Sequence, residues 1–149
     1  MWPELELVTG PVHTGKTTRL AARVAAAPGA CCGLLAPVDV AGLRYLRCAV
    51  SGEQRRLSCG AEAPDAVAVG PYHFHEGVFT WGRVLLAAHD AAFPRRTLIV
   101  DELGKLELRG AGLAPVCWRV LARRRANGQP ALVVVRDSLV AAVRERLAE

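Results

Sequence analysis

The sequence lacks an apolar run long enough for a transmembrane helix, which needs about 20 such residues. Arg19, Arg23, Pro28 and Pro37 interrupt the Ala- and Leu-rich stretches of the first third. Residues 1–4 carry an acid and lack the basic-then-apolar order of a signal peptide. We therefore expect no membrane association and a cytoplasmic location.

The cysteines lack the pattern of a disulfide framework or a zinc knuckle. They are odd in number and no two have C-x-x-C spacing. The five are Cys31, Cys32, Cys48, Cys59 and Cys117. His73 and His75 could join Cys59 around a metal, but no other ligand follows at suitable spacing. We expect reduced, mostly buried cysteines.

Lysine is nearly absent: Lys16 and Lys105 are the only two among nineteen basic residues, which leaves seventeen arginines. Against fourteen acids the net charge is +5, which permits binding of nucleic acid or another polyanion. The basic residues are scattered except for the triplet at 123–125. We interpret this triplet as a solvated helix end whose cations face the helix dipole, with polyanion binding as the less favoured alternative.

With 149 residues, of which 52% are hydrophobic, the chain can bury a core and fits one domain spanning residues 1–149. Apolar periodicity predicts strands at 5–9, 31–36, 97–100 and 131–135, a hairpin formed by 43–50 and 54–58, and helices at 17–27, 76–92, 113–125 and 138–147. Helices that alternate with apolar strands predict an α/β fold, with a mainly parallel sheet covered on both faces.

Residues 10–17 read G-P-V-H-T-G-K-T and complete the phosphate-loop pattern G-x-x-x-x-G-K-S/T. The segment follows a predicted strand and opens a predicted helix, where backbone N–H groups and the helix dipole bind phosphate. The candidate nucleotide-binding residues are Gly10, Pro11, Val12, His13, Thr14, Gly15, Lys16, Thr17 and Thr18.

Each position of this loop has an expected role. Gly10 and Gly15 let the backbone wrap the β-phosphate without Cβ clashes. Lys16 reaches the β- and γ-phosphate oxygens, and the hydroxyl of Thr17 binds Mg²⁺. Thr18 is placed to contact the α-phosphate. The intervening residues contribute mainly backbone, and His13 is expected to face solvent.

Two adjacent carboxylates, Asp101 and Glu102, follow the apolar strand at 97–100. They lie at the carboxyl end of a predicted parallel strand, where ligands of open α/β sheets bind. Asp101 is expected to hold Mg²⁺, and Glu102 to orient and deprotonate the attacking water.

Neutralising the γ-phosphate in the transition state calls for a further cation. Arg136, directly after the strand at 131–135, is the first candidate and Lys105 the second. The alternative to a catalytic role for Arg136 is a surface ion pair with Asp137 or Glu145. For Lys105 the alternative is an ion pair with a neighbouring acid.

Together these segments resemble a family of small P-loop nucleoside triphosphatases, the cancer-related nucleoside triphosphatases and their thermophile relatives. Residues 7–18 resemble the family's phosphate loop, and 100–108 its D-E-I-G-x-x-E-L signature. Residues 33–40 are similar to G-F-x-T-x-E-V-R, and 134–136 to the V-V-H-R ending. The resemblance implies a three-layer, RecA-like fold and Mg²⁺-dependent hydrolysis of ATP, GTP and other nucleoside triphosphates, with weak base selectivity and Glu102 activating water.

The sequence departs from the family at three positions. Ala41 stands where the family has arginine, Asp39 replaces a glutamate, and Val135 replaces the histidine before Arg136. Because Asp39 is one methylene shorter, a contact made by glutamate would be lost or bridged by water.

Two other functions fit a phosphate loop. A small-molecule or nucleotide kinase would need an acceptor pocket near 72–83, and the sequence has no arginine-rich lid insertion. A nucleotide-gated adaptor would bind a protein or RNA through its basic surface. The sequence does not define the oligomeric state.

Overall fold

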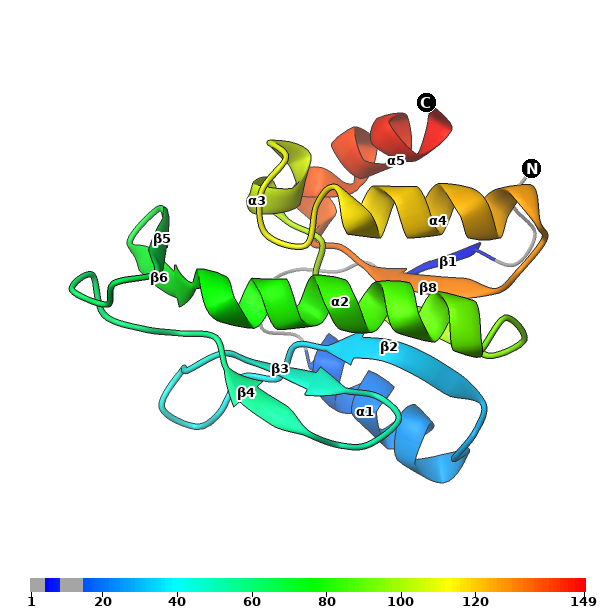
Figure 1. Cartoon of the computed structure of the whole chain (residues 1–149), viewed down its shortest axis with the longest axis horizontal. Helices are drawn as coiled ribbons and strands as arrows, with labels where there is room; N and C mark the ends of the chain where they lie inside the picture. Colours follow the sequence, from blue (N-terminus) through cyan, green and yellow to red (C-terminus); the bar gives the residue numbers. More distant parts are fainter. Residues whose placement is uncertain (1–4, 9–14) are drawn as a thin grey trace.

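The computed structural model describes residues 5–8 and 15–149 (Figure 1). Its elements in chain order are β1 (Leu5–Val8), α1 (Lys16–Ala26), β2 (Cys31–Leu35), β3 (Tyr45–Cys48), β4 (Gln54–Arg56), β5 (Ala66–Val69), β6 (Tyr72–His75), α2 (Glu76–Ala92), β7 (Thr97–Val100), α3 (Lys105–Leu108), α4 (Val116–Ala126), β8 (Ala131–Val134), the 3-10 helix η1 (Asp137–Leu139) and α5 (Val140–Ala148).

The main sheet has six strands in the order β1-β8-β7-β2-β3-β4. The first four are parallel to one another, and β3 and β4 continue the sheet as an antiparallel hairpin beside β2. This arrangement confirms the predicted α/β fold with a mainly parallel sheet and a hairpin.

Side chains of β2, β7 and β8 alternate between two cores, because successive residues of a strand point to opposite faces. One core, covered by α2, α4 and α5, includes Cys32, Leu34, Leu98, Val100, Ala131 and Val133. The other, covered by α1, includes Leu20, Leu35, Ile99, Leu132 and Val134. Figure 1 shows α1, in blue, on the opposite side of the sheet from α2 and α4, so the molecule has three layers.

The parallel strands bring their carboxyl ends to one edge of the sheet. Val8 at the end of β1 pairs with Val134 of β8, and Val100 of β7 pairs with both Val133 of β8 and Leu34 of β2. The segments that follow these strands therefore lie side by side. Among the described residues they include the acidic pair after β7 and Arg136 after β8.

Gly33 in β2 lies where no side chain fits. Its φ is +97°, and a Cβ there would lie 2.2 Å from the backbone oxygen of Ile99 in β7. Gly52 has a similar φ of +78° but open space around it. Gly33→Ala should therefore destabilise the fold by about 1–3 kcal/mol more than Gly52→Ala, the cost of overpacking. Urea unfolding of both variants measures this, and equal losses would contradict it.

Two elements were not predicted. The hairpin of β5 and β6 forms a separate two-stranded sheet, and α3 is a single short turn after the acidic pair. Of the four residues of β5, three are partly buried and none is fully buried. Such a short strand gives little hydrophobic alternation for a pattern to detect.

Arg124 corrects the interpretation of the basic triplet as a solvated helix end. Its side chain is fully buried and donates hydrogen bonds to the carboxylate of Asp90 and to three backbone carbonyls, those of Phe93, Arg96 and Pro130. Arg123 also pairs with Asp90, at 2.5 Å. The cluster joins the end of α4 to the segments before β7 and β8, so Arg124 serves packing, whereas Arg123 and Arg125 are exposed as predicted for a solvated helix end.

All five cysteines are free; Cys32, Cys48 and Cys117 are buried, and Cys31 and Cys59 are partly buried, as predicted for mostly buried cysteines. Within the described part of the chain, no three His, Cys, Asp or Glu side chains gather as metal ligands, and no helix has both the length and the apolarity to cross a bilayer.

Candidate functional site

Thr17 and Asp101 meet at the carboxyl edge of the sheet, although 84 positions separate them in sequence. The hydroxyl of Thr17, in the first turn of α1, donates to Asp101 Oδ2 at 2.9 Å. The backbone N–H of Ala36, just after β2, donates to the same oxygen at 2.8 Å. Three adjacent elements thus converge on one carboxylate.

Asp101 is buried, with 3% of its surface exposed, and its other oxygen, Oδ1, has no hydrogen-bond partner among the residues that the structure describes. Burial raises the pKa of this carboxyl, and the hydrogen bonds from Ala36 and Thr17 oppose that effect. A buried oxygen without a partner is costly unless a ligand satisfies it. Carboxylate and hydroxyl oxygens suit Mg²⁺, so the residues present fit the predicted ion.

Glu102 adopts a backbone conformation that is unusual for a side chain larger than glycine. Its φ is +63°, the one positive value among the described non-glycine residues. Such a conformation costs about 1–3 kcal/mol and persists only where surrounding contacts enforce it. Here the N–H of Leu103 donates to Val134 O at 3.0 Å, which ties the turn to the end of β8. The side chain of Glu102 therefore does not point where a continuing strand would place it.

Arg44, three positions after Ala41 where the family has arginine, forms an ion pair with Glu102, although it is not among the predicted catalytic and binding residues. Its Nη1 donates to Glu102 Oε2 and, at 3.0 Å, to the carbonyl of Ala36. Both charged side chains are about one-fifth exposed, at 23% and 20%. The 58 positions between them left no sequence signal for this contact.

Glu107 fixes the loop that follows the acidic pair. It is buried, its Oε1 accepts from Gly104 N at 2.9 Å, and its Oε2 accepts from Leu113 N at 3.0 Å. Burial raises the pKa of this carboxyl, against the effect of the two hydrogen bonds. Both oxygens are engaged within the protein, so Glu107 supports the turn instead of facing a ligand.

A comparison with solved structures finds a similar chain. The crystal structure of THEP1 from the hyperthermophile Aquifex aeolicus superimposes with a TM-score of 0.70 over 95% of this chain and 83% of that one, at 16% sequence identity. The chain therefore shares the fold of that structure, a mainly parallel sheet flanked by helices on both faces. No family model and no curated protein matches the sequence, so the closer family resemblance described above stays a prediction.

The remaining predicted site residues are placed as follows. Gly10, Pro11, Val12, His13 and Thr14 lie outside the described residues. Gly15, with φ +77°, precedes α1 in the left-handed conformation that glycine favours, and Lys16 is the first residue of α1. Thr18 is exposed in the first turn of that helix.

The two predicted cations lie near the acidic turn. Arg136 follows β8 and is partly exposed, and Lys105 is exposed at the start of α3. Within the described part of the chain, neither forms an ion pair, so the alternative of a pair with Asp137 or Glu145 is not what this structure has.

Asp39 organises its own loop. Its Oδ1 accepts from the backbone N–H groups of Ala41 and Leu43, each at 2.9 Å, and its Oδ2 accepts from the hydroxyl of Tyr45. These hydrogen bonds, that of Leu43 foremost, lower the pKa of the Asp39 carboxyl. Asp39 thereby shapes the segment from which Arg44 reaches Glu102.

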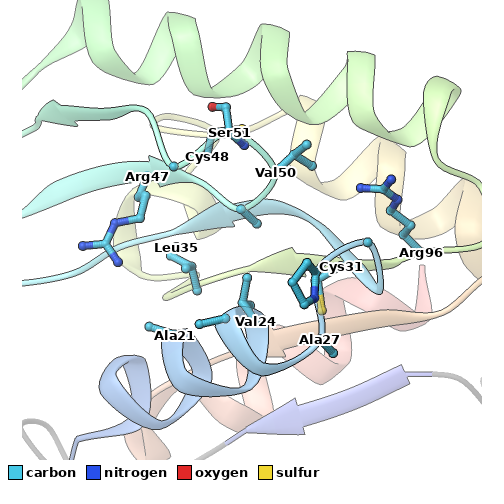
Figure 2. Close-up of a pocket in the computed structure, with 15 residues that line it drawn as sticks. Ala21, Val24, Ala27, Cys31, Leu35, Arg47, Cys48, Val50, Ser51 and Arg96 are labelled. Atoms are coloured by element: carbon cyan, nitrogen blue, oxygen red, sulfur yellow. Dashed lines mark hydrogen bonds between the residues drawn. The ribbon is translucent and has the colours of Figure 1, made fainter.

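A groove of about 330 Å³ lies elsewhere, between α1 and the turn that joins β3 to β4 (Figure 2). Ala21 and Val24 of α1 face Leu35 across it, and Arg47 and Arg96 are the charged residues of its wall. None of the predicted site residues lines this groove. It is distinct from the edge where Thr17 meets Asp101.

Proposed function

We propose that the protein hydrolyses nucleoside triphosphates to nucleoside diphosphate and inorganic phosphate in the presence of Mg²⁺. The observation that carries this proposal is the hydrogen bond between the Thr17 hydroxyl and the buried Asp101 carboxylate. It joins the last residue of the phosphate-loop motif to the first residue of the acidic pair, on a P-loop nucleoside triphosphatase fold.

Residues 10–18 bind the triphosphate in this proposal, with backbone N–H groups around the β-phosphate and Lys16 on the β- and γ-phosphate oxygens. Thr17 and Asp101 hold Mg²⁺, which neutralises charge on the β- and γ-phosphates when bound. The sequence motif assigns no group to the base, in keeping with weak base selectivity. Residues 1–149 act as one domain.

Glu102 is the proposed general base. Its Oε1 accepts a proton from water as the water oxygen bonds to the γ-phosphorus, and the bond from that phosphorus to the β,γ-bridging oxygen breaks. The bridging oxygen keeps the electron pair and leaves with the diphosphate. Arg136, at the same edge, contributes positive charge toward the γ-phosphate.

Phosphate release from ATP, GTP, CTP and UTP, measured with and without Mg²⁺ and with no acceptor added, tests the proposal. Release from several of the four, dependent on Mg²⁺ and yielding the diphosphate, is the expected result. Tight triphosphate binding without release would contradict hydrolysis and favour the kinase or adaptor.

Lys16→Ala should weaken triphosphate binding. The ammonium group is a charge-assisted donor to phosphate, and such hydrogen bonds contribute about 1.5–3 kcal/mol, or roughly 10- to 150-fold in dissociation constant. Titration with a fluorescent ATP analogue measures this loss. Arg119→Ala removes an exposed cation of α4 that has no assigned role, and an equal loss there would contradict the assignment.

A further inference from the structure

We propose that Arg44 is the positioning residue for Glu102, holding one carboxylate oxygen so that the other faces the water. This inference rests on the proposed function, since it concerns the same general base. The contact that carries it is the pair between Arg44 Nη1 and Glu102 Oε2.

The backbone of Arg44 is fixed by its neighbours. Its N–H donates to Ser58 Oγ at 2.8 Å, and its carbonyl accepts from the N–H groups of Leu57 and Ser58 at 2.9 and 3.1 Å. A β-bridge to Val38 adds a contact on the other side. The guanidinium is therefore presented from a rigid base, as a positioning contact requires.

The Arg44 guanidinium also ties the acidic turn to the end of β2. The carbonyl of Ala36 accepts from Arg44 Nη1, and the N–H of the same residue donates to Asp101 Oδ2. Ala36 thus connects Arg44 with Asp101, the predicted Mg²⁺ ligand, while Arg44 itself contacts Glu102, the predicted base. Movement of Arg44 would therefore disturb both carboxylates.

One carboxylate oxygen of Glu102 is available to accept a proton. Oε2 accepts from Arg44, whereas Oε1 forms no hydrogen bond with the described residues. A carboxylate with one oxygen anchored keeps the lone pairs of the other for a proton. Arg44 makes both of its side-chain hydrogen bonds to described residues through Nη1, to Glu102 and to the carbonyl of Ala36.

The charges around the acidic pair also support a positioning role for Arg44. Asp101 and Glu102 are adjacent carboxylates that repel each other, and the ion pair of Arg44 with Glu102 places a positive charge beside them. Arg136 and Lys105 form no ion pair with either carboxylate in the described part of the chain. Among the described residues, Arg44 forms an ion pair with the acidic pair through Glu102.

The test compares Arg44→Met, Glu102→Gln and the double variant for kcat, KM and affinity for a fluorescent ATP analogue. Arg44→Met should lower kcat by up to about 100-fold, the cost of misplacing a catalytic group, with affinity close to that of the wild type. In the Glu102→Gln background the same change should have little further effect, because Arg44 acts through Glu102. Arg44→Lys, which keeps a donor, should recover part of kcat.

Arg47→Met is the matched control. It removes an arginine from the neighbouring strand whose side chain donates to Gln54, away from the acidic pair, and it should leave kcat unchanged. Thermal unfolding of each variant identifies any loss caused by misfolding.

Three outcomes would overturn the inference. A kcat of Arg44→Met equal to that of the wild type would show that Glu102 needs no such anchor. A loss of affinity that matched the loss of kcat would make Arg44 a substrate-binding residue. Full additivity in the double variant would mean that Arg44 acts independently of Glu102. If the wild type itself released no phosphate, the proposed function would fail as well. The three outcomes above all require an active wild type, so failure of the inference alone can be told from failure of the proposed function.

Discussion

Glu102→Gln is expected to lower kcat for triphosphate hydrolysis by about 10²- to 10⁴-fold, the usual contribution of a general base. Glutamine has nearly the shape of glutamate, and its carbonyl oxygen can still accept from Arg44. The substitution therefore removes basicity while it preserves the contact that orients the side chain. Triphosphate affinity should remain close to that of the wild type, because residues 10–18 carry the binding.

Phosphate release at saturating ATP, together with analogue titration, measures both quantities. Glu53→Gln is the matched control, since Glu53 is an exposed acid paired with Arg55 near β4. It should hydrolyse at the parental rate. If Glu102→Gln also hydrolyses at that rate, Glu102 is not the base.

Arg124→Met is expected to lower the free energy of unfolding by about 3–5 kcal/mol, the cost of breaking a buried ion pair by removing one partner. The change leaves Asp90, which is 4% exposed, with only the partly exposed Arg123 beside it. It also removes the side-chain donor to the carbonyls of Phe93, Arg96 and Pro130, although those of Phe93 and Pro130 still accept from backbone N–H groups. The segments that lead into β7 and β8 lose the contact that joins them.

Urea unfolding measures this loss. Arg119→Met, an exposed position on the same helix, should change stability by no more than about 0.5 kcal/mol. Asp90→Leu combined with Arg124→Met should recover part of the loss, because apolar replacement of both partners removes the unpaired charge. An unfolding midpoint of Arg124→Met equal to that of the wild type would show that the cluster contributes nothing to stability.

Much of the fold follows from local sequence pattern. The strands of the parallel sheet are short apolar runs between helices, and their common direction brings the segments after β1 and β7 to one edge. That rule alone places the phosphate-loop motif beside Asp101, and the hydrogen bond from Thr17 agrees with it.

Sequence pattern does not predict the contacts of Arg44 and Arg124. Arg44 reaches Glu102 through the conformation of the loop after β2, which Asp39 and Ser58 fix by contacts that no periodicity encodes. Arg124 stands in a run of three arginines, and only the packing of α4 on α2 decides which of them is buried. In both cases the partner lies more than 30 positions away.

The most direct test of the central claim is a competition between water and other acceptors for the γ-phosphate. Wild-type protein is incubated with γ-labelled ATP and Mg²⁺ in the presence of nucleoside monophosphates and nucleosides, and the label is followed into each product. Label recovered as inorganic phosphate, at a rate that the acceptors do not change, is the predicted result. Label transferred to an acceptor faster than phosphate is released would contradict the account and make the protein a kinase.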